Sequence, residues 1–384
     1  FNLQKKANPY RFAFIMMEGI IMEKRMTVSR DGKPCYDIVF EKDFSALAGE
    51  IKALGYGERK LCIVTDSHVE PLYAARVRDA LEAENVFPAG EENKNLDTVR
   101  SLYTFLIERR FARKDCLIAL GGGVVGDLTG FTAATYLRGI DFIQIPTTLL
   151  AQVDSSIGGK TGVDFDGYKN MVGAFHMPAL VYMNLSTLTT LEARQFYSGF
   201  AEAMKSALIA DARYYEWMIA NMYEICDREP EVMAELVRRS CEIKRKIVEN
   251  DPEEKGERAL LNLGHTIGHA IEKAKGISLK NGECVALGCV AAAFISWKKE
   301  MLPMEEYYEI RDMFVPFNLP ISVDELEPER ILDLTRSDKK MDNGQIRFIL
   351  LNKIGKAVID MSVTDEQILA AIDEINFTEE DAHE

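Results

Sequence analysis

The sequence predicts an α/β N-terminal domain followed by a mainly α-helical C-terminal domain. Between Lys60 and Pro146, short apolar runs alternate with stretches whose apolar residues recur at helical spacing. After about Leu191 the strand signals fade and long helical patterns follow. The 384 residues exceed what one small core usually serves, which favours two domains in contact. The expected division is an extension of unknown role over residues 1–25, an α/β domain over 26–190 and a helical domain over 191–384.

Three buried strands and three helices make up the expected α/β domain. The strands are Lys60–Asp66, Asp115–Leu120 and Asp141–Ile145, the last of them stopped by Pro146. The helices are Val69–Glu84, Asn95–Arg110 and Asp127–Leu137. This alternation predicts a parallel sheet with helices on both faces. Ligands of such folds bind at the carboxyl ends of the strands and between domains, so we expect the active site in the interdomain cleft.

Helical spacing dominates the C-terminal half. Helices are expected over Glu192–Ala210, Pro230–Asn250, Arg258–Lys273 and Val285–Lys299. A hairpin is expected from Ile346–Leu351 and Ala357–Ile359, joined by a glycine turn.

The composition argues against two classes of partner. The formal net charge of -15 disfavours broad binding to nucleic acid, although it leaves room for a local basic pocket. Because no run of about 18 apolar residues is present, we expect no membrane span. The seven cysteines are dispersed without a CxxC pair, which is typical of reduced thiols in a cytoplasmic protein.

A glycine-rich turn, Gly121–Asp127, stands between a predicted strand and a predicted helix. Glycines there allow backbone amides to approach a phosphate, and the start of the helix favours negative charge. The spacing is not GxGxxG, so a tight strand–helix turn without a ligand is the alternative.

Four polar residues, Arg258, Asn262, His265 and His269, recur in steps of four, three and four. On one helix they would lie within about 60° of a single face, amid largely apolar neighbours. Such a polar stripe predicts a buried site rather than a solvated surface. The two histidines could both bind a metal, or one could be a ligand and the other an acid–base or anion-binding group. Hydrogen-bonded core histidines are the alternative without function.

Glu202 and Lys205 lie three residues apart on another largely apolar predicted helix. The carboxylate is a candidate metal ligand and the ammonium a candidate anion-binding group. An ion pair on a solvated face explains the spacing equally well.

The segment from Asp154 to Gly162, followed by Lys169 and Asn170, is rich in glycine and carries two lysines. Its spacing excludes a Walker A loop, but it is similar to an anion-binding loop at a domain boundary. A flexible linker is the alternative.

Taken together and in this order, these segments resemble the 3-dehydroquinate synthase family. The matching motifs are Gly121–Asp127, Arg138, Pro146–Ser156, Gly158–Gly162, Lys169–Asn170, Ala201–Glu202 and Leu261–His269, within a likeness that runs from about Arg25 to about Asp360. The resemblance implies a Rossmann-like NAD-binding domain and conversion of 3-deoxy-D-arabino-heptulosonate 7-phosphate to 3-dehydroquinate and phosphate, in the shikimate pathway to aromatic amino acids. NAD would be used catalytically: a ring hydroxyl is oxidised, phosphate is eliminated, the ketone is reduced, and the opened ring closes by an aldol step.

The resemblance also implies which residues hold each ligand. NAD contacts fall on Asp66, Glu91, Lys94, Gly123, Val124, Val125, Gly126, Asp127, Thr147, Thr148, Asp154, Lys160, Lys169, Thr187, Leu188, Thr189 and Thr190. Substrate contacts fall on Lys160, Asn170, Lys205, Lys244, Arg258, Asn262, His269 and one of Lys339 and Lys340. Arg138 matches an arginine that reaches a phosphate across the interface of an expected homodimer. Glu202 and His265 would bind Zn2+ or Co2+, and the cationic set suits a small phosphorylated sugar acid.

One position departs from the family's pattern. The family's third metal ligand is a histidine in a His-Gly-Glu motif, and this chain has Asn281, Gly282 and Glu283 there. An amide oxygen is a weaker zinc ligand than imidazole and suits hard ions better. We therefore hypothesise weaker metal binding and reduced turnover. Asn281 or a water could still complete the site, and a disabling change is the third alternative.

Three other functions stay open. Another sugar-phosphate cyclase, acting for example on sedoheptulose 7-phosphate, would share most of the motifs. A polyol dehydrogenase dependent on NAD and a metal would produce net NADH, which a cyclase does not. A catalytically weakened binding homologue would keep affinity for NAD or substrate without turnover.

Overall fold

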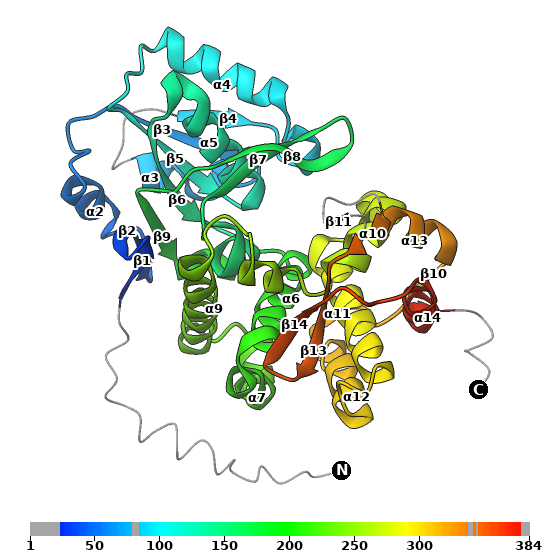
Figure 1. The fold of residues 1–384 in the computed structure, drawn as a ribbon. Helices are drawn as coiled ribbons and strands as arrows, with labels where there is room; N and C mark the ends of the chain where they lie inside the picture. Colours follow the sequence, from blue (N-terminus) through cyan, green and yellow to red (C-terminus); the bar gives the residue numbers. More distant parts are fainter. Residues whose placement is uncertain (1–23, 79–83, 337–340, 343–344, 378–384) are drawn as a thin grey trace.

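The computed structural model describes residues 24–78, 84–336, 341–342 and 345–377. Within them, an N-terminal part built around a parallel-dominated sheet adjoins a C-terminal part built mainly from helices (Figure 1). The expected fold class is therefore confirmed. Among the described residues, every helix is too short or too polar to cross a bilayer.

The central sheet has seven strands in the order β1-β2-β9-β6-β5-β3-β4, and only β1 and β2 pair antiparallel. The three strands expected from the sequence are β3, β5 and β6, in the middle of the sheet. Their near-continuous apolar residues follow from burial on both faces. The strands are β1 Arg25–Arg30, β2 Lys33–Glu41, β3 Leu61–Asp66, β4 Glu84–Phe87, β5 Cys116–Gly121, β6 Asp141–Pro146 and β9 Leu180–Asn184.

Helices cover both faces of this sheet. Leu102 and Leu128, from α4 and α5, belong to the core on one face, and Leu47 and Val77, from α2 and α3, to the core on the other. The helices are α2 Leu47–Ala53, α3 Ala75–Arg78, α4 Leu96–Glu108 and α5 Gly123–Thr135, with shorter turns η1 Glu70–Ala74, η2 Glu91–Asn93, η3 Tyr136–Arg138, η4 Ala151–Ser155 and η5 Leu185–Thr189.

The expected helix Val69–Glu84 is wrong at its last residue, Glu84. Helical turns end at Arg78 in the described part, and Glu84 instead begins β4. The segment Glu84–Phe87 pairs in parallel with β3, and Phe87 is buried in the core. Tertiary strand pairing has therefore overridden a local helical pattern.

The glycine-rich segment after Asp154 holds an element that the sequence did not reveal. It forms an antiparallel hairpin of β7 Lys160–Phe165 and β8 Tyr168–Phe175, which extends from the sheet domain towards α10 (Figure 1). Gly162 pairs with Gly173, and a Cβ on Gly173 would stand 2.3 Å from the Thr161 carbonyl oxygen. The glycines therefore allow close strand approach, so the linker alternative is wrong here.

The C-terminal part packs its helices around α6 and α11. The expected helices near 192–210, 230–250 and 285–299 are present, as is the expected hairpin. The helices are α6 Ala193–Ala210, α7 Ala212–Ala220, α8 Met222–Cys226, α9 Pro230–Asn250, α10 His265–Lys275, α11 Asn281–Lys298, α12 Met304–Asp312, α13 Pro328–Arg336 and α14 Asp365–Ile375. Short turns are η6 Glu257–Asn262, η7 Gly276–Ser278 and η8 Val315–Phe317, and the strands are β10 Val323–Asp324, β11 Met341–Asp342, β12 Gln345–Ile346, β13 Phe348–Lys353, β14 Lys356–Asp360 and β15 Asn376–Phe377.

The single helix expected over Arg258–Lys273 is a second correction. A 3-10 turn, η6, ends at Asn262, and α10 begins only at His265. Between them Gly264 has a positive φ of 77°. A Cβ there would meet the backbone nitrogen of Cys289 on α11 at 2.8 Å, so the break lets α10 and α11 approach closely.

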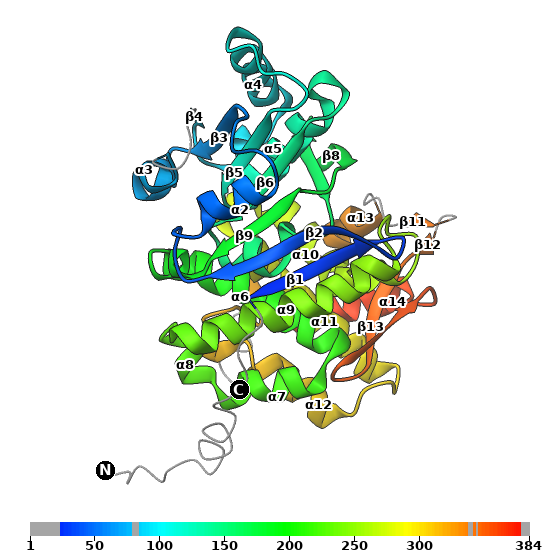
Figure 2. The same cartoon turned by 90° about the vertical axis from the view of Figure 1, so that its left-hand side faces the viewer.

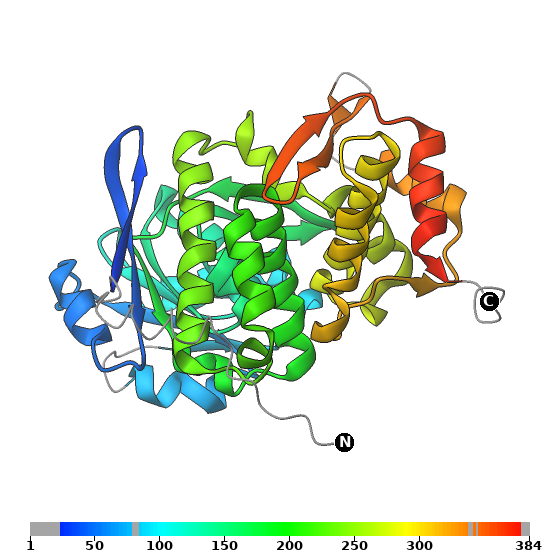
Figure 3. The ribbon, with the colours of Figure 1, turned by 90° about the horizontal axis from the view of Figure 1, so that it is seen from below.

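One apolar core joins the two halves of the chain. Tyr36 and Ile38 of β2 belong to the same buried cluster as Phe200 of α6 and Val237 of α9. Figures 2 and 3 show the β1–β2 ribbon (blue) beside α9. The sheet edge is therefore packed against the helical part, and the division at residue 190 remains a prediction.

Candidate active site

The glycine turn between β5 and α5 leads directly into the N-terminus of α5. Gly122 precedes α5 without a side-chain hydrogen bond that caps the helix. A Cβ on Gly122 would lie 3.0 Å from the Thr148 side chain, and one on Gly123 would lie 3.1 Å from the Ser155 hydroxyl. The first amides of this 13-residue helix are thus available to an anion in a cradle that side chains would fill. This is a fit for the phosphates of a dinucleotide.

A buried lysine organises the next part of the site. The Nζ of Lys94 donates to Asp127 at 2.7 Å and to the Asn170 amide oxygen at 2.6 Å. It thereby ties the start of α4, helix α5 and the hairpin tip together. Burial raises the pKa of Asp127 above its ordinary value, although the charge of Lys94 opposes this. Burial also opposes the charge on Lys94, but Asp127 and Glu91 outweigh it and raise the pKa of Lys94.

The hairpin tip contacts the helical part of the chain. The Nζ of Lys169 lies 2.7 Å from Glu272 on α10 and 3.7 Å from Glu91. The ammonium of Lys273 stands 4.7 Å from the centre of the Tyr168 ring, a cation–π distance. These contacts close one side of the space between the sheet domain and α10.

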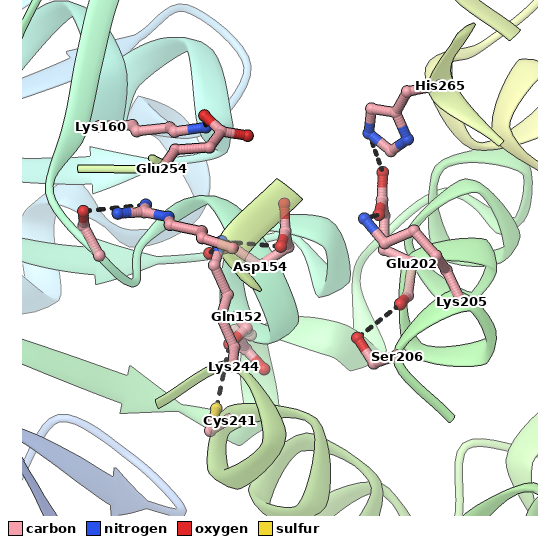
Figure 4. Close-up of polar contacts among 12 residues, drawn as sticks. Gln152, Asp154, Lys160, Glu202, Lys205, Ser206, Cys241, Lys244, Glu254 and His265 are labelled. Atoms are coloured by element: carbon pink, nitrogen blue, oxygen red, sulfur yellow. Dashed lines mark hydrogen bonds and ion pairs between the residues drawn. The ribbon is translucent and has the colours of Figure 1, made fainter. Parts of the chain in front are cut away.

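A second Asp–Lys pair joins η4 to α9 (Figure 4). Lys244 donates to the Asp154 carboxylate at 2.7 Å and to the Asp154 carbonyl oxygen at 2.6 Å. Burial alone would raise the pKa of Asp154, but the charges of Lys244 and Lys205 outweigh it and hold that pKa far below its ordinary value. Burial lowers the pKa of Lys244 against the pull of Asp154. Lysines therefore dominate the charge that acts on Asp154.

Arg258 is fixed almost wholly by backbone oxygens. Its guanidinium donates to the carbonyl oxygens of Gly158, at 3.0 Å, and Pro252, and it is 1% exposed. Its buried Nε has no hydrogen-bond partner among the described residues. Burial lowers the pKa of Arg258, with Glu254 opposing. An arginine that is held in place and keeps one unused N–H donor is preorganised to donate to an oxygen of a ligand.

Glu202, His265 and Asn281 come together from three helices, as the sequence led us to expect. The Nε2 of His265 is 4.0 Å from Glu202, and its Nδ1 is 3.0 Å from the Leu263 carbonyl oxygen. The amide of Asn281 donates to Glu202 at 3.2 Å. Lys205 forms an ion pair with Glu202 and both are buried, so the solvated-face alternative is wrong (Figure 4). We call Glu202, Lys205, His265 and Asn281 the metal corner.

Two of the side chains in the metal corner suit a divalent cation, and the third suits it less well. The carboxylate of Glu202 and the imidazole of His265, whose Nδ1 lies at hydrogen-bond distance from a backbone carbonyl oxygen, are donor types that bind divalent cations. The third side chain is an amide, which is a weak ligand for zinc. Accordingly, no three His, Cys, Asp or Glu side chains gather in a metal-binding group within the part of the chain that the structure describes.

His269 lies next to the metal corner, with its ring centre 4.9 Å from that of His265. The two histidines were expected on one uninterrupted helix with Arg258 and Asn262, which is incorrect. His265 and His269 belong to α10, whereas Arg258 and Asn262 belong to the preceding 3-10 turn, η6. The break between the two elements gives the two pairs separate orientations.

The remaining expected residues have different surroundings. Thr147 and Thr148 follow β6 beside the glycine turn, where the Thr147 amide donates to the Gly121 carbonyl oxygen at 2.9 Å. Asp66 accepts from the amides of His68, at 2.9 Å, and Val69, at 3.0 Å, at the end of β3. Residues 187–190 include the end of η5 and the residue after it. The side-chain amide of Gln152 donates to the Thr187 hydroxyl oxygen there at 3.2 Å. Arg138 is exposed, with a positive φ of 68°, apart from the other site residues, and Lys339 and Lys340 lie outside the described residues.

Two carboxylates at the site were missed by the sequence analysis. Glu254 forms an ion pair with Lys160 and accepts from Asn262 at 2.7 Å, and Glu272 holds Lys169. Neither belongs to a glycine motif or to the polar stripe. An acidic residue in a loop and one near the end of a helix have no spacing that distinguishes them from surface charges.

Comparison with known proteins yields a consistent set of matches. Residues 84–198 match the family model described as 3-dehydroquinate synthase N-terminal, and residues 199–341 match 3-dehydroquinate synthase C-terminal. A 3-dehydroquinate synthase of Nitrosomonas europaea is 48% identical over 306 residues, which cover 78% of this chain and 83% of that protein. One of Acetivibrio thermocellus is 40% identical over 343 residues, covering 88% and 95%.

Solved structures of sugar cyclases share the fold. A 2-epi-5-epi-valiolone synthase of Streptomyces hygroscopicus, solved with NAD+ and Zn2+ bound, has a TM-score of 0.83 and 27% identity, covering 91% of this chain and 99% of that one. A 2-deoxy-scyllo-inosose synthase complexed with carbaglucose-6-phosphate, NAD+ and Co2+ has a TM-score of 0.81 and 25% identity, with the same coverage.

Proposed function

The chain belongs to the 3-dehydroquinate synthase family, and on that premise we propose that it converts 3-deoxy-D-arabino-heptulosonate 7-phosphate to 3-dehydroquinate and phosphate. The proposal makes it a lyase of the shikimate pathway that uses NAD and a divalent cation, Zn2+ or Co2+. The observation that carries it is the cationic end of the cleft, where Asp154 is flanked by Lys244, Lys205 and Lys160. A substrate with both a phosphate and a carboxylate needs such an excess of positive charge.

NAD would take a hydride from a ring carbon and return it after phosphate has left, and a divalent cation would polarise the reacting hydroxyl oxygens. The transient ketone acidifies the neighbouring C–H, which makes elimination possible near neutral pH. The Gly122–Gly123 cradle would hold NAD, and Glu202 and His265 would hold the divalent cation. Asn281 completes this ligand set as its weakest member.

The anionic groups of the substrate are assigned to the chain's cations. Lys160, Lys244 and Arg258 bind and orient them, and the buried ammonium of Lys205 supports the reacting end. His269, beside His265, holds or moves a proton at its imidazole nitrogen near the leaving group. We assign Arg138 to the substrate phosphate bound in the site of a partner subunit, so the working form would be a homodimer. We place the enzyme in the cytoplasm, where its seven free cysteines stay reduced.

Phosphate release tests the proposal directly. The chain is incubated with the seven-carbon sugar acid phosphate, with and without NAD and added Zn2+ or Co2+, while phosphate and NADH are followed. We expect release that requires NAD and the metal, without net NADH. Net NADH formation would indicate a polyol dehydrogenase, and release only from sedoheptulose 7-phosphate would indicate another cyclase.

The variant Asn281→His separates a weakened enzyme from a wrong assignment. If the natural chain releases no phosphate and Asn281→His does, the chain is a synthase scaffold disabled at its metal corner. If neither the natural chain nor Asn281→His releases phosphate from any cyclase substrate, the proposed function is contradicted. Light scattering at several protein concentrations tests the homodimer, and mixing Arg138→Ala with a second inactive variant tests whether subunits complement each other.

A further inference from the structure

Helix α6 presents three polar side chains, spaced four residues apart and therefore on one face, to the first three residues of α11. Each side chain contacts a different residue of α11. The pairs, in order along α6, are Arg194 with Glu283, Ser198 with Gly282, and Glu202 with Asn281. The last pair belongs to the metal corner, and the first two join the same pair of helices outside it.

Arg194 and Glu283 form a two-point ion pair. The Nε of Arg194 donates to Glu283 Oε1 at 2.6 Å, and its Nη2 donates to Glu283 Oε2 at 2.7 Å. The same Nη2 donates to the Ser278 carbonyl oxygen at 2.6 Å, and Glu283 Oε2 accepts from the Lys280 backbone amide at 2.7 Å. One arginine therefore fixes the first turn of α11 and the segment that leads into it.

The start of α11 depends on α6 because the residue before the helix cannot cap it. Lys280 has no side-chain oxygen to accept from the free amides of the first turn. The Ser198 hydroxyl of α6 supplies that acceptor for the Gly282 amide, at 2.9 Å. A Cβ on Gly282 would clash with the Ser198 carbonyl oxygen, so the two backbones are in direct contact. Contacts from α6 therefore determine where α11 begins.

Asn281, the first residue of α11, donates from its amide to Glu202 at 3.2 Å. The Arg194 side chain is 45% exposed and that of Glu202 3% exposed, so Arg194 lies outside the buried metal corner. We propose that Arg194, acting through Glu283, is a positioning residue of the metal corner: it fixes the first turn of α11 on α6 and so sets the place of Asn281 beside Glu202. The proposal rests on the proposed function only in taking the metal corner as a divalent-cation site. Groups that orient a ligand tune cation affinity without touching the cation.

Zinc affinity, measured by competition with a fluorescent chelator, tests this role without turnover. Asn281→His gives the more sensitive background, because imidazole is the stronger zinc ligand. In that background we expect Arg194→Gln to raise the Kd for Zn2+ by roughly 10-fold to 100-fold, and in the natural chain by roughly threefold to tenfold. Removal of a positive charge would by itself tighten cation binding, so a loss of affinity has the opposite sign to an effect of net charge.

Two controls separate positioning from a general loss of stability. Arg238→Gln removes the same charge from another two-point pair, in which Arg238 donates to the Glu235 carboxylate at 3.1 and 3.3 Å on α9. In the Asn281→His background it should leave the Kd for Zn2+ within about twofold. In an Asn281→Ala background, Arg194→Gln should also change the Kd by less than about twofold, because no ligand remains to be positioned.

Two further variants keep the test decisive if Arg194→Gln disturbs folding. Arg194→Lys retains the charge but not the planar fork, so we expect a Kd between those of arginine and glutamine at this position. Ser198→Ala removes the acceptor of the Gly282 amide from the same junction. In the Asn281→His background it should raise the Kd for Zn2+ by roughly threefold to tenfold.

An unchanged or lower Kd for Zn2+ in Arg194→Gln would overturn the positioning role. An equal rise in Arg238→Gln, or in the Asn281→Ala background, would also overturn it, because the effect would not pass through Asn281. The same holds if neither the natural chain nor Asn281→His binds Zn2+ or Mn2+. Phosphate release is scored separately. A rise specific to Arg194→Gln without release from the sugar acid would retain the role and reject that substrate, and release without such a rise would do the reverse.

Discussion

Two Asp–Lys pairs flank the cleft, and the same local geometry has opposite consequences in them. Lys94 lies 2.7 Å from Asp127 on the cofactor side, and Lys244 lies 2.7 Å from Asp154 on the substrate side. Both lysines are buried. Yet the pKa of Asp127 is raised by burial, whereas the pKa of Asp154 is held far below its ordinary value because nearby lysines outweigh burial.

The difference comes from the next charges outward. Glu91 adds negative charge near Asp127, while Lys205 and Lys160 add positive charge around Asp154. A further carboxylate thus acts on Asp127 on the cofactor side, whereas further lysines act on Asp154 on the substrate side. A chain with a net charge of -15 can attract a dianion locally in this way. The distance within an ion pair does not determine its electrostatic role; its surroundings do.

The largest expected effect comes from removing one lysine from each pair. Lys244→Met and Lys94→Met each leave a carboxylate without its cation, and we expect each to lower the free energy of unfolding by about 3 kcal/mol, near the low end for broken buried pairs because both carboxylates are partly exposed. Only Lys244→Met should also weaken phosphate binding, by roughly 10-fold to 100-fold. Urea unfolding and phosphate calorimetry measure the two effects. Equal losses of phosphate affinity would remove the distinction between the two sides.

A smaller effect is expected at the metal corner. Asn281→His replaces an amide with an imidazole beside Glu202 and His265, and we expect zinc affinity to rise by roughly 10-fold to 100-fold, with less change for Mn2+. Competition with a fluorescent zinc chelator measures this without turnover. Asn318→His, which adds a histidine on the positive-φ residue after η8, controls for zinc binding by any added imidazole. An unchanged zinc affinity in Asn281→His would show that Asn281 is not a ligand.

Prediction from the sequence succeeded where a signal was local. The central strands β3, β5 and β6 carry continuous apolar runs, and the glycine turn follows β5 directly, so both the sheet and this turn were foreseen. The helical half was foreseen from spacing in the same way. Glu84, the first residue of β4, was assigned to the preceding helix because only its pairing with β3 makes it part of a strand.

The structure brings many of the predicted site residues together, but not in the predicted arrangement. The spacing of Arg258, Asn262, His265 and His269 fits one helix, but close packing of α10 on α11 at Gly264 breaks it. Glu254 was missed because its role depends on a contact with Lys160, 94 residues earlier in the chain. Long-range ion pairs leave no periodic signal in a sequence, whereas glycine turns and amphipathic helices do.

Glycine substitutions compare how tightly each side of the cleft is packed. A Cβ on Gly282, beside Asn281, would stand 1.9 Å from the Ser198 carbonyl oxygen, which is backbone. A Cβ on Gly126 of the cofactor side would meet the end of the Gln144 side chain at 2.6 Å, which can rotate away. We expect Gly282→Ala to lower the free energy of unfolding by about 1–3 kcal/mol and Gly126→Ala to lower it less. Gly49→Ala, in α2 with nothing within 4 Å, should raise it by about 0.5–1 kcal/mol. Equal losses at Gly282 and Gly126 would contradict the difference in packing.

The smallest effect is the pH dependence of stability, and it should have opposite signs on the two sides. Below about pH 4 the unfolded chain protonates Asp154 while the folded chain does not, so this residue makes stability fall as the pH falls. Asp127 has a raised pKa, so the folded chain takes up its proton first and stability rises as the pH falls towards about 4. Each residue changes the slope by at most about 1.4 kcal/mol per pH unit.

Urea unfolding between about pH 3 and pH 6 measures these slopes in Asp154→Asn and Asp127→Asn. Asp154→Asn should flatten the acid loss of stability, and Asp127→Asn should steepen it, whatever either substitution does to stability at neutral pH. The opposite signs are the informative result, because both variants remove one carboxylate from an Asp–Lys pair of the same length. If both variants flattened the profile, the surplus of positive charge would extend to the cofactor side, and anion binding by the cleft would no longer depend on Lys244 and its neighbours alone.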